Sequence, residues 1–575
     1  MAEAGAGAGP RLAERLAAFA AEATFDRLPA AVTDSVRQRV LDILGICVAA
    51  SPLETSGAAR EWVRDQGGRT QANAVGVAEP VPAVLAAFVN GVLAHSLDYD
   101  DTHLPSVLHP SACVVPAALA AAQYAGADGR ATIAAIAVGL ETCVRLGMAG
   151  YSSDSRNSVF FEHGQHATSI CGAVAGAVSA GLLLGLDAGR ICDAIGVAAS
   201  MGSGIIEANR EGGSVKRMHC GWAAHAGVSA AQLAARGFTG PPTVLEGRFG
   251  FFQAWLRGDF DPDAITGGLG SDWAVPGIFF KPYPANHFTH AAIDAAIALR
   301  AGGLEPGDVE SAVLGVPAPV VRTIGEPIEV KRAPQTGYMA QFSGPYVVAA
   351  GLLGGAGLGV GLGDFTDELA REPRRRELMA RVSVVADDRC TQLFPDQFPA
   401  VLRVRTRDGR DLRAEVMSNR GGPDRPLSGA ELRTKFRDNV AGLLRPEVAE
   451  QTEQAVEHLD QLADVGAVLR PLCLLRGLSL VSRGGFTWRR STFLSRTSLL
   501  FPRTAMSPIV TTSRSRTGGS RRWDRTFPPT ARRRSSTGAA GMRFPGWSTP
   551  TSTGESITRS PTTRTRKAEP ARRAG

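Results

Sequence analysis

The chain of 575 residues is long enough for two to four domains, and 44% of its residues are apolar, which is ample for large cores. Its eight cysteines include no C-x-x-C pair, which disfavours a zinc ribbon, an iron–sulfur site and a disulfide framework and favours a reducing compartment. The net charge of +7 conceals two opposite regions: residues 471–575 hold 21 Lys and Arg against 3 Asp and Glu, whereas the first 470 residues hold 41 basic and 52 acidic residues.

Residues 11–275 predict the first part of a large helical domain. The opening ten residues lack the basic and apolar regions of a signal peptide, so we expect a cytoplasmic protein. The longest uncharged run, Ile170 to Leu186, is mostly Gly, Ala and Ser, and this composition favours a buried helix over a membrane span. Apolar residues recur at helical spacing in four further segments: 12–23, 35–50, 81–97 and 132–148.

The pattern changes near residue 276 and predicts an α+β lid domain over 276–418. Three segments have the pattern of strands: 310–324, 379–389 and 400–417. The last of them predicts a hairpin that turns at Asp408-Gly409. Two helical segments lie between the strands: 289–301 and 341–353. Helical spacing then resumes over 419–470, so we expect a mainly α fold in which both ends of the chain build the helical domain and the α+β unit is inserted.

Residues 471–575 form a basic, low-complexity tail without helical or strand periodicity. Of its 21 basic residues, 20 are arginine, and a mixture of Arg, Pro, Ser, Thr and Gly is also what GC-rich coding DNA gives when it is read out of frame. We therefore expect a disordered tail that is a frameshift product or an unrelated appendage. A nucleic-acid-binding tail is the competing interpretation, which the lack of an accompanying reader module disfavours.

One short loop concentrates titratable groups. HSLDYDDTHLPSVLHPS, residues 95–111, connects two predicted helices and places six such groups within fifteen positions: His95, Asp98, Asp100, Asp101, His103 and His109. The spacing fits no tight metal-ligand template, and helix capping needs one such residue instead of six. A carboxylate beside an imidazole holds one tautomer and tunes its proton affinity. Acid–base chemistry, capping and a metal site are the three alternatives.

Two other segments carry cations in unusual surroundings. Lys216 and Arg217, followed by His219, stand at the start of an Ala-rich helix, where positive charge is unfavourable unless an anion lies nearby; solvated side chains are the alternative. Lys281 follows two phenylalanines and precedes a proline, with His287 further along. Together with the Asp/His loop, these segments indicate a small polycarboxylate held by Lys and Arg while Asp and His move protons.

The same segments resemble the MmgE/PrpD family, which includes 2-methylcitrate dehydratase and cis-aconitate decarboxylase. The similarity is carried by NGVLAHSLDYDDTH, GSVKRMHCGWAAHAG and KPYPANHFTHAAIDA and extends in order from about residue 11 to residue 470. It implies a helical domain with a smaller α+β lid, a homodimer, and an active site between the domains without an essential metal or organic cofactor.

Carried over position by position, the resemblance implies five catalytic residues: Asp98, Thr102, His109, Lys216 and Lys281. Four more side chains in these segments are expected to bind substrate: Arg217, His103, His219 and His287. The leading hypothesis is a hydro-lyase that eliminates water from a hydroxy-tricarboxylate, with His109 oriented by Asp98 and the lysines binding carboxylates. Decarboxylation or epimerisation of a related acid are the alternatives on the same site. We expect no metal and no membrane or nucleic-acid partner.

Overall fold

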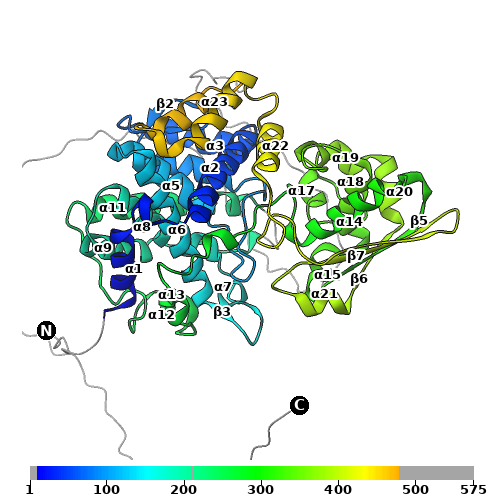
Figure 1. Cartoon of the computed structure of the whole chain (residues 1–575), viewed down its shortest axis with the longest axis horizontal. Coiled ribbons are helices and arrows are strands. Elements are labelled where there is room, and N and C mark those ends of the chain that lie inside the picture. Colours follow the sequence, from blue (N-terminus) through cyan, green and yellow to red (C-terminus); the bar gives the residue numbers. More distant parts are fainter. Residues whose placement is uncertain (1–9, 209–212, 478–575) are drawn as a thin grey trace, which may run out of the picture. The chain divides into compact units, whose positions relative to one another are not determined.

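The computed structural model describes residues 10–208 and 213–477. This part of the chain is mainly helical, with small sheets (Figure 1). The basic tail was predicted to be disordered. Its residues from 478 onward lie outside the described range, so this remains a prediction.

Long helices build the first hydrophobic core, which contains residues from Leu12 to Ile278 and again from Phe436 to Leu472. Several of these helices are buried nearly all round, because their sequences are apolar on every face. The long helices are α1 (Leu12–Glu22), α2 (Ala30–Ala50), α3 (Glu54–Gln66), α4 (Ala83–Ala94), α5 (Ser111–Ala125), α6 (Gly129–Ala149), α8 (Ala167–Leu183), α9 (Ala188–Ala199) and α11 (Val215–Ala234). Short elements between them are β1 (Ala72–Ala74), β2 (Val77–Val81), β3 (Tyr151–Ser152), β4 (Asn157–Ser158), α7 (Val159–Glu162), α12 (Phe251–Leu256) and α13 (Asp263–Thr266).

The helices predicted in this region are confirmed as α1, α2, α4, α6 and α8. Pro82 and Pro110 stand immediately before α4 and α5, where a missing amide hydrogen removes no helical hydrogen bond. Helix α6 is long and apolar enough to cross a membrane, but 89% of its apolar window is buried inside the fold, as in the central helix of a globular core.

A second hydrophobic core lies in the α+β region and contains residues from Tyr283 to Val416. Its four-stranded sheet has the order β6-β5-β7-β8, in which β5 and β6 are parallel and the other neighbours are antiparallel. The strands are β5 (Val309–Val316), β6 (Val382–Ala386), β7 (Ala400–Thr406) and β8 (Asp411–Val416). The helices are α14 (His290–Ala301), α15 (Ala318–Ile324), α16 (Ile328–Lys331), α17 (Gly337–Ala340), α18 (Gly344–Leu353), α19 (Asp367–Arg371), α20 (Pro373–Ala380) and α21 (Asp388–Leu393).

Two sequence predictions for this region have different outcomes. The hairpin is confirmed: β7 and β8 pair in antiparallel register, and Gly409 in the turn has a φ of 90°. The strand predicted over 310–324 is wrong in its second half, because the chain leaves β5 at Val316 and forms helix α15. Pro317 stands directly before that helix, a position where proline favours a new helix over continued strand pairing.

The last helices return to the first core. Helices α22 (Gly429–Val440) and α23 (Pro446–Glu457) follow the sheet, and α22 lies beside α2 in Figure 1. A buried ion pair joins them, since Lys435 Nζ lies 2.6 Å from Asp42 Oδ1. The same ammonium group donates to the Tyr99 carbonyl oxygen at 3.2 Å and lies 3.8 Å from the centre of the Tyr99 ring. Helix α22 is thus fixed to the loop that carries the Asp/His cluster.

One close helix contact positions both sides of that cluster. A Cβ atom at Gly91 of α4 would lie 2.7 Å from Gly221 Cα of α11, and one at Gly221 would lie 2.4 Å from the Phe88 carbonyl oxygen. Larger side chains at either glycine would therefore separate the helices. The contact brings the end of α4, where the loop begins, next to the start of α11, where Lys216 lies.

Replacement of Lys435 by alanine is expected to lower the unfolding free energy by about 3–5 kcal/mol, because Asp42 is left as a buried charge without its partner. Denaturant unfolding followed by circular dichroism measures the loss. The control is Lys435→Met combined with Asp42→Leu, which removes both charges and is expected to restore most of the lost stability. Equal losses in the single and double variants would contradict the ion-pair account.

Candidate active site

The loop between α4 and α5 carries the Asp/His cluster into the interior. Asp98, Asp100, Thr102 and His109 are all buried. A two-way backbone bridge holds the loop to the segment before Lys281: Thr102 N donates to Phe279 O at 2.8 Å, and Phe279 N donates to Thr102 O at 2.8 Å. Lys281 and the loop therefore lie side by side although they are far apart in the sequence.

The Asp98 carboxylate is the meeting point of two lysines. Lys281 Nζ donates to Asp98 Oδ1 at 3.0 Å and to the Asp98 carbonyl oxygen at 2.9 Å, and Lys216 Nζ lies 4.0 Å from Oδ1. Burial on its own would raise the pKa of Asp98, but the two ammonium groups hold it well below the ordinary range. Asp98 also has a φ of 53°, a left-handed conformation that aspartate tolerates better than most residues. The two lysines thus converge on one ionised oxygen.

The His109 ring has one nitrogen fixed and one available. Its Nδ1 lies 2.7 Å from the Asp101 carbonyl oxygen, which can only accept, so Nδ1 carries the hydrogen. Thr102 Oγ1 lies 3.4 Å from the same nitrogen. Burial lowers the pKa of His109 to about 3, so the ring is neutral at pH 7 and presents the lone pair of Nε2. The expectation that Asp98 orients His109 is wrong, because the Asp98 carboxylate is engaged by lysines and a backbone carbonyl performs that role.

Asp100 and His95 form a second acid–base pair that the sequence analysis left unassigned. His95 Nδ1 donates to Asp100 Oδ2 at 2.7 Å, and His109 Nδ1 lies 4.0 Å from the same oxygen. Burial opposes ionisation of Asp100, but the two imidazoles lower its pKa to about 2. One carboxylate therefore stabilises a proton on either ring, whose centres are 5.3 Å apart.

Two further imidazoles extend this group away from His109. The His166 ring centre lies 5.4 Å from that of His95 and 5.0 Å from that of His219, and the Nδ1 atoms of His166 and His219 are 3.0 Å apart. Sequence reasoning missed His166, which follows Gln165 and stands directly before the apolar helix α8. His219 was expected to bind substrate; the structure pairs it with His166, one turn after Lys216 on α11, and its role in substrate binding stays a prediction.

On the lid side, two buried groups face the cluster without protein partners in the described part of the chain. The first group is the His287 ring, neither of whose nitrogens has a partner, and the second is the Oε1 atom of Gln341. The His287 ring meets those of Phe279 and Phe398 edge to face, with centres 5.8 and 5.4 Å apart. Gln341 Nε2 donates to the Leu97 carbonyl oxygen at 3.5 Å, which places Gln341 next to the loop. His287 remains a candidate for substrate binding, and Gln341 joins it.

Three other side chains named in the sequence analysis, those of Arg217, His103 and Asp101, are held by neighbouring protein groups. Arg217 donates to Thr55 Oγ1 at 3.3 Å and lies over the Tyr338 ring, and His103 Nδ1 pairs with Ser106 Oγ at 2.7 Å within its own loop. The structure does not bring these two side chains onto Asp98. The capping alternative applies to Asp101, which accepts from Ser111 N at the start of α5 and pairs with Arg39 at 2.6 Å. Over residues 10–208 and 213–477, no group of three or more His, Cys, Asp or Glu is arranged to hold a metal ion.

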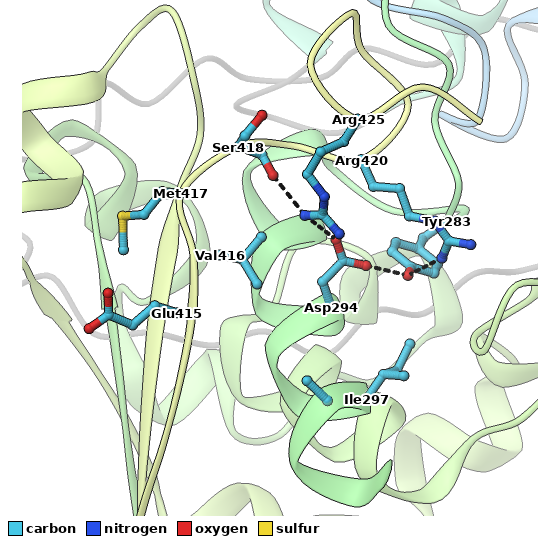
Figure 2. A pocket seen from close by; sticks show the side chains of 10 residues that line it. Tyr283, Asp294, Ile297, Glu415, Val416, Met417, Ser418, Arg420 and Arg425 are labelled. Carbon is cyan, nitrogen blue, oxygen red and sulfur yellow. Dashed lines mark hydrogen bonds and ion pairs between the residues drawn. The ribbon is translucent and has the colours of Figure 1, made fainter. Parts of the chain in front are cut away.

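A cavity of about 520 Å³ lies in the lid, between α14 and the end of β8 (Figure 2). Tyr283, two residues after Lys281, donates to Asp294 Oδ1 at 2.5 Å and accepts from Arg420 Nη1 at 3.1 Å. Arg425 Nη1 lies 3.3 Å from Asp294 Oδ2, as Figure 2 shows. These lining charges are paired with one another, so we assign the network a supporting role: it holds the segment that carries Lys281.

Acid is expected to destabilise the protein, because several buried imidazoles stay neutral in the folded chain. Burial lowers the pKa of His109 and His290 to about 3 and that of His103 and His219 to about 4, from 6.5. Between pH 6.5 and 5 the unfolded chain binds more protons, so folding stability decreases by about 1–2 kcal/mol for each such ring. Thermal unfolding at pH 8 and pH 5 measures the effect, and a midpoint that does not decrease at pH 5 would contradict it.

Comparison with known proteins gives consistent matches along the chain. The family model of the MmgE/PrpD N-terminal domain matches residues 14–263, and that of the MmgE/PrpD C-terminal domain matches residues 283–461. A cis-aconitate decarboxylase of Homo sapiens is 29% identical over 477 residues, which cover 78% of this chain and 92% of the relative.

Two further relatives carry the same name. The cis-aconitate decarboxylase of Mus musculus is 28% identical over 473 residues, covering 78% of this chain and 91% of the relative. That of Aspergillus terreus is 26% identical over 419 residues, covering 69% and 83%. Since the two family models together match residues 14–263 and 283–461, which is well over half of the chain, the chain belongs to the MmgE/PrpD family.

Proposed function

We propose that the protein is a decarboxylase for a small unsaturated tricarboxylate of the cis-aconitate type. The observation that carries the proposal is the convergence of Lys216 and Lys281 on one buried carboxylate oxygen beside the neutral ring of His109. The names of the relatives support decarboxylation over the elimination of water expected from the sequence.

The reaction needs an electron sink and one proton. Loss of carbon dioxide from the saturated carbon leaves its bonding electron pair, which forms a new double bond to the central carbon. The pair of the original double bond then moves to the carbon next to another carboxylate, where a proton is added. The trianion and one proton thus become a dianion and carbon dioxide. Negative charge gathers on the carboxylate beside the protonated carbon, so fixed cations there lower the barrier.

The described side chains suit these requirements. A substrate carboxylate competes with Asp98 for the Lys216 and Lys281 ammonium groups, which then stabilise the developing charge. The His109 Nε2 atom is available to hold the proton, and Thr102 lies beside that ring. Binding of a trianion raises the proton affinity of neighbouring imidazoles, so His109 is expected to take up a proton when substrate binds. The negative charge of nearby Asp100 also favours protonation of the His109 ring.

Dehydration of a hydroxy-tricarboxylate is the second candidate reaction. Two hydrogen-bond acceptors on the lid side of the site support it. Gln341 Oε1 and one nitrogen of a neutral His287 ring are hydrogen-bond acceptors without protein partners in the described residues. A carboxylate cannot donate to them, whereas a substrate hydroxyl can. In this reaction neutral His109 would remove the proton next to a carboxylate and then, as the imidazolium, return that proton to the hydroxyl, which leaves as water.

Purified full-length protein is expected to release carbon dioxide from cis-aconitate, and Lys281→Ala is expected to lower kcat/KM by about 10²–10³-fold because a fixed cation is lost. His109→Gln is expected to lower kcat by about 10²-fold or more, because it cannot transfer the proton. Carbon dioxide release and the appearance of unsaturated product from citrate and 2-methylcitrate are measured together, which separates the two candidates.

The matched control is Lys331→Ala, a lid lysine that donates to the Phe342 carbonyl oxygen and does not contact the cluster. It is expected to leave kcat/KM unchanged. Turnover of a hydroxy acid without carbon dioxide release would favour the second candidate. Full activity in Lys281→Ala would overturn the shared binding site.

A further inference from the structure

Arg217 stands beside Lys216 in the first turn of α11, but the two cations have different surroundings. The Lys216 ammonium group is balanced by Asp98, whose Oδ1 atom lies 4.0 Å from Nζ. Within residues 10–208 and 213–477, Arg217 forms no ion pair with a carboxylate, and its side chain donates one hydrogen bond, to Thr55 Oγ1 at 3.3 Å. Since a guanidinium group has five N–H donors, Arg217 can bind an anion with those that remain.

The place of Arg217 in its helix also favours an anion. Two positive side chains in the first turn are unfavourable, because the helix dipole is positive at that end. Ser214, the residue before the helix, forms no side-chain cap with the first amide groups. Asp98 offsets the charge of Lys216, so an anion beside Arg217 would offset the second charge.

The lid contributes Tyr338 to the same place. The Arg217 Cζ atom lies 5.5 Å from the centre of the Tyr338 ring, so the guanidinium group faces the ring. Burial raises the pKa of Tyr338, and the negative charge of Asp98 raises it further, whereas the charges of Lys216 and Arg217 act in the opposite direction. The Tyr338 hydroxyl is therefore a hydrogen-bond donor at pH 7 and lies near enough to the site to be affected by its charges.

The contacts of α17 direct Tyr338 toward the site. Gly337 N donates to Asp367 Oδ1 at 2.8 Å, which fixes the start of this helix. Gln341 follows Tyr338 by three residues, and side chains with this spacing lie on the same face of a helical turn. Gln341 Nε2 donates to the Leu97 carbonyl oxygen at 3.5 Å, so this face of α17 is turned toward the loop between α4 and α5.

Lys216 marks the side of the site that opens to solvent. Its side chain is 21% exposed, whereas that of Lys281 is 2% exposed. Arg217 is half-buried and Tyr338 is half-exposed, so both lie on this open side. A substrate with one carboxylate between the two lysines therefore extends its remaining carboxylates from the interior toward this side.

The proposed reaction indicates which carboxylate Arg217 would bind. The lysines stabilise the carboxylate beside the carbon that is protonated, where charge gathers. A cation beside the departing carboxylate would oppose its conversion to neutral carbon dioxide. The third carboxylate, on the central carbon, keeps its charge from substrate to product, so a cation can bind it equally well throughout.

We propose that Arg217 and Tyr338 bind the carboxylate on the central carbon of the substrate and so select a tricarboxylate over a dicarboxylate, an inference that rests on the proposed function for the reaction itself. The guanidinium group supplies charge-assisted hydrogen bonds, and the Tyr338 hydroxyl donates another from the lid. Both side chains are substrate-binding residues that act on affinity and take no part in proton transfer.

The test compares Tyr338→Phe and Arg217→Gln with Tyr124→Phe and Arg236→Gln. The second pair is a matched control from beyond the other end of α11, where Arg236 Nη2 donates to the Tyr124 hydroxyl at 3.1 Å. Carbon dioxide release from cis-aconitate by the full chain is measured. Each site variant is expected to raise KM about tenfold and to leave kcat within about twofold, because uniform binding is lost. The control variants are expected to keep both constants.

Calorimetric titration with tricarballylate and glutarate tests the inference without turnover. These saturated acids differ only in the carboxylate on the central carbon. The unchanged protein is expected to bind tricarballylate more tightly by about tenfold or more, and the ratio of affinities is expected to fall about tenfold in Tyr338→Phe and in Arg217→Gln. Glutarate affinity is expected to stay the same.

Site variants that lower kcat at unchanged KM, or that leave the ratio of affinities unchanged, would overturn the inference. Absence of carbon dioxide release by an unchanged protein that shows the expected ratio would contradict the proposed function instead, and the carboxylate-binding role of Arg217 and Tyr338 would stand.

Discussion

The site depends on one electrostatic constraint: a buried aspartate carboxylate held between two ammonium groups. Asp98 would be costly to bury as an ion, and Lys281, which is also buried, would be costly to bury alone. The two opposite charges compensate the cost of burying each other. Lys216 adds a second positive charge 4.0 Å from the same Asp98 oxygen. The left-handed backbone at Asp98 costs about 1 kcal/mol, which its contacts with Lys281 offset. Since one anion already occupies this position, another carboxylate of similar shape can compete for it.

The surrounding fold holds the loop from several directions. Arg39 of α2 pairs with Asp101 and donates to the Ile278 carbonyl oxygen at 2.7 Å, so one guanidinium joins the loop to the segment that leads to Lys281. The glycine contact between α4 and α11 sets where the loop begins and where Lys216 lies. Lys435 fixes the Tyr99 carbonyl from the returning helix α22. Residues that are distant in sequence thus restrict a short loop, and such restriction keeps catalytic groups in place.

Sequence reasoning identified five of the long helices, α1, α2, α4, α6 and α8, and the β7–β8 hairpin, because apolar spacing and the Asp-Gly turn are local signals. The bridge between Thr102 and Phe279 has no such local signal. The partner of a side chain is equally hard to predict: Asp98 was assigned to His109 and pairs with lysines, while His109 uses a backbone carbonyl. His166 was missed because only its contacts with the rings of His95 and His219, which are distant in the sequence, show that it belongs to the site.

The central claim is that Lys216 and Lys281 together bind a substrate carboxylate. A crystal structure of the full chain with tricarballylate, a saturated tricarboxylate that cannot lose carbon dioxide by the proposed route, tests this claim most directly. The account predicts carboxylate oxygens within hydrogen-bonding distance of both Nζ atoms and next to His109. A ligand bound elsewhere, with Lys281 still engaged only by Asp98, would contradict it.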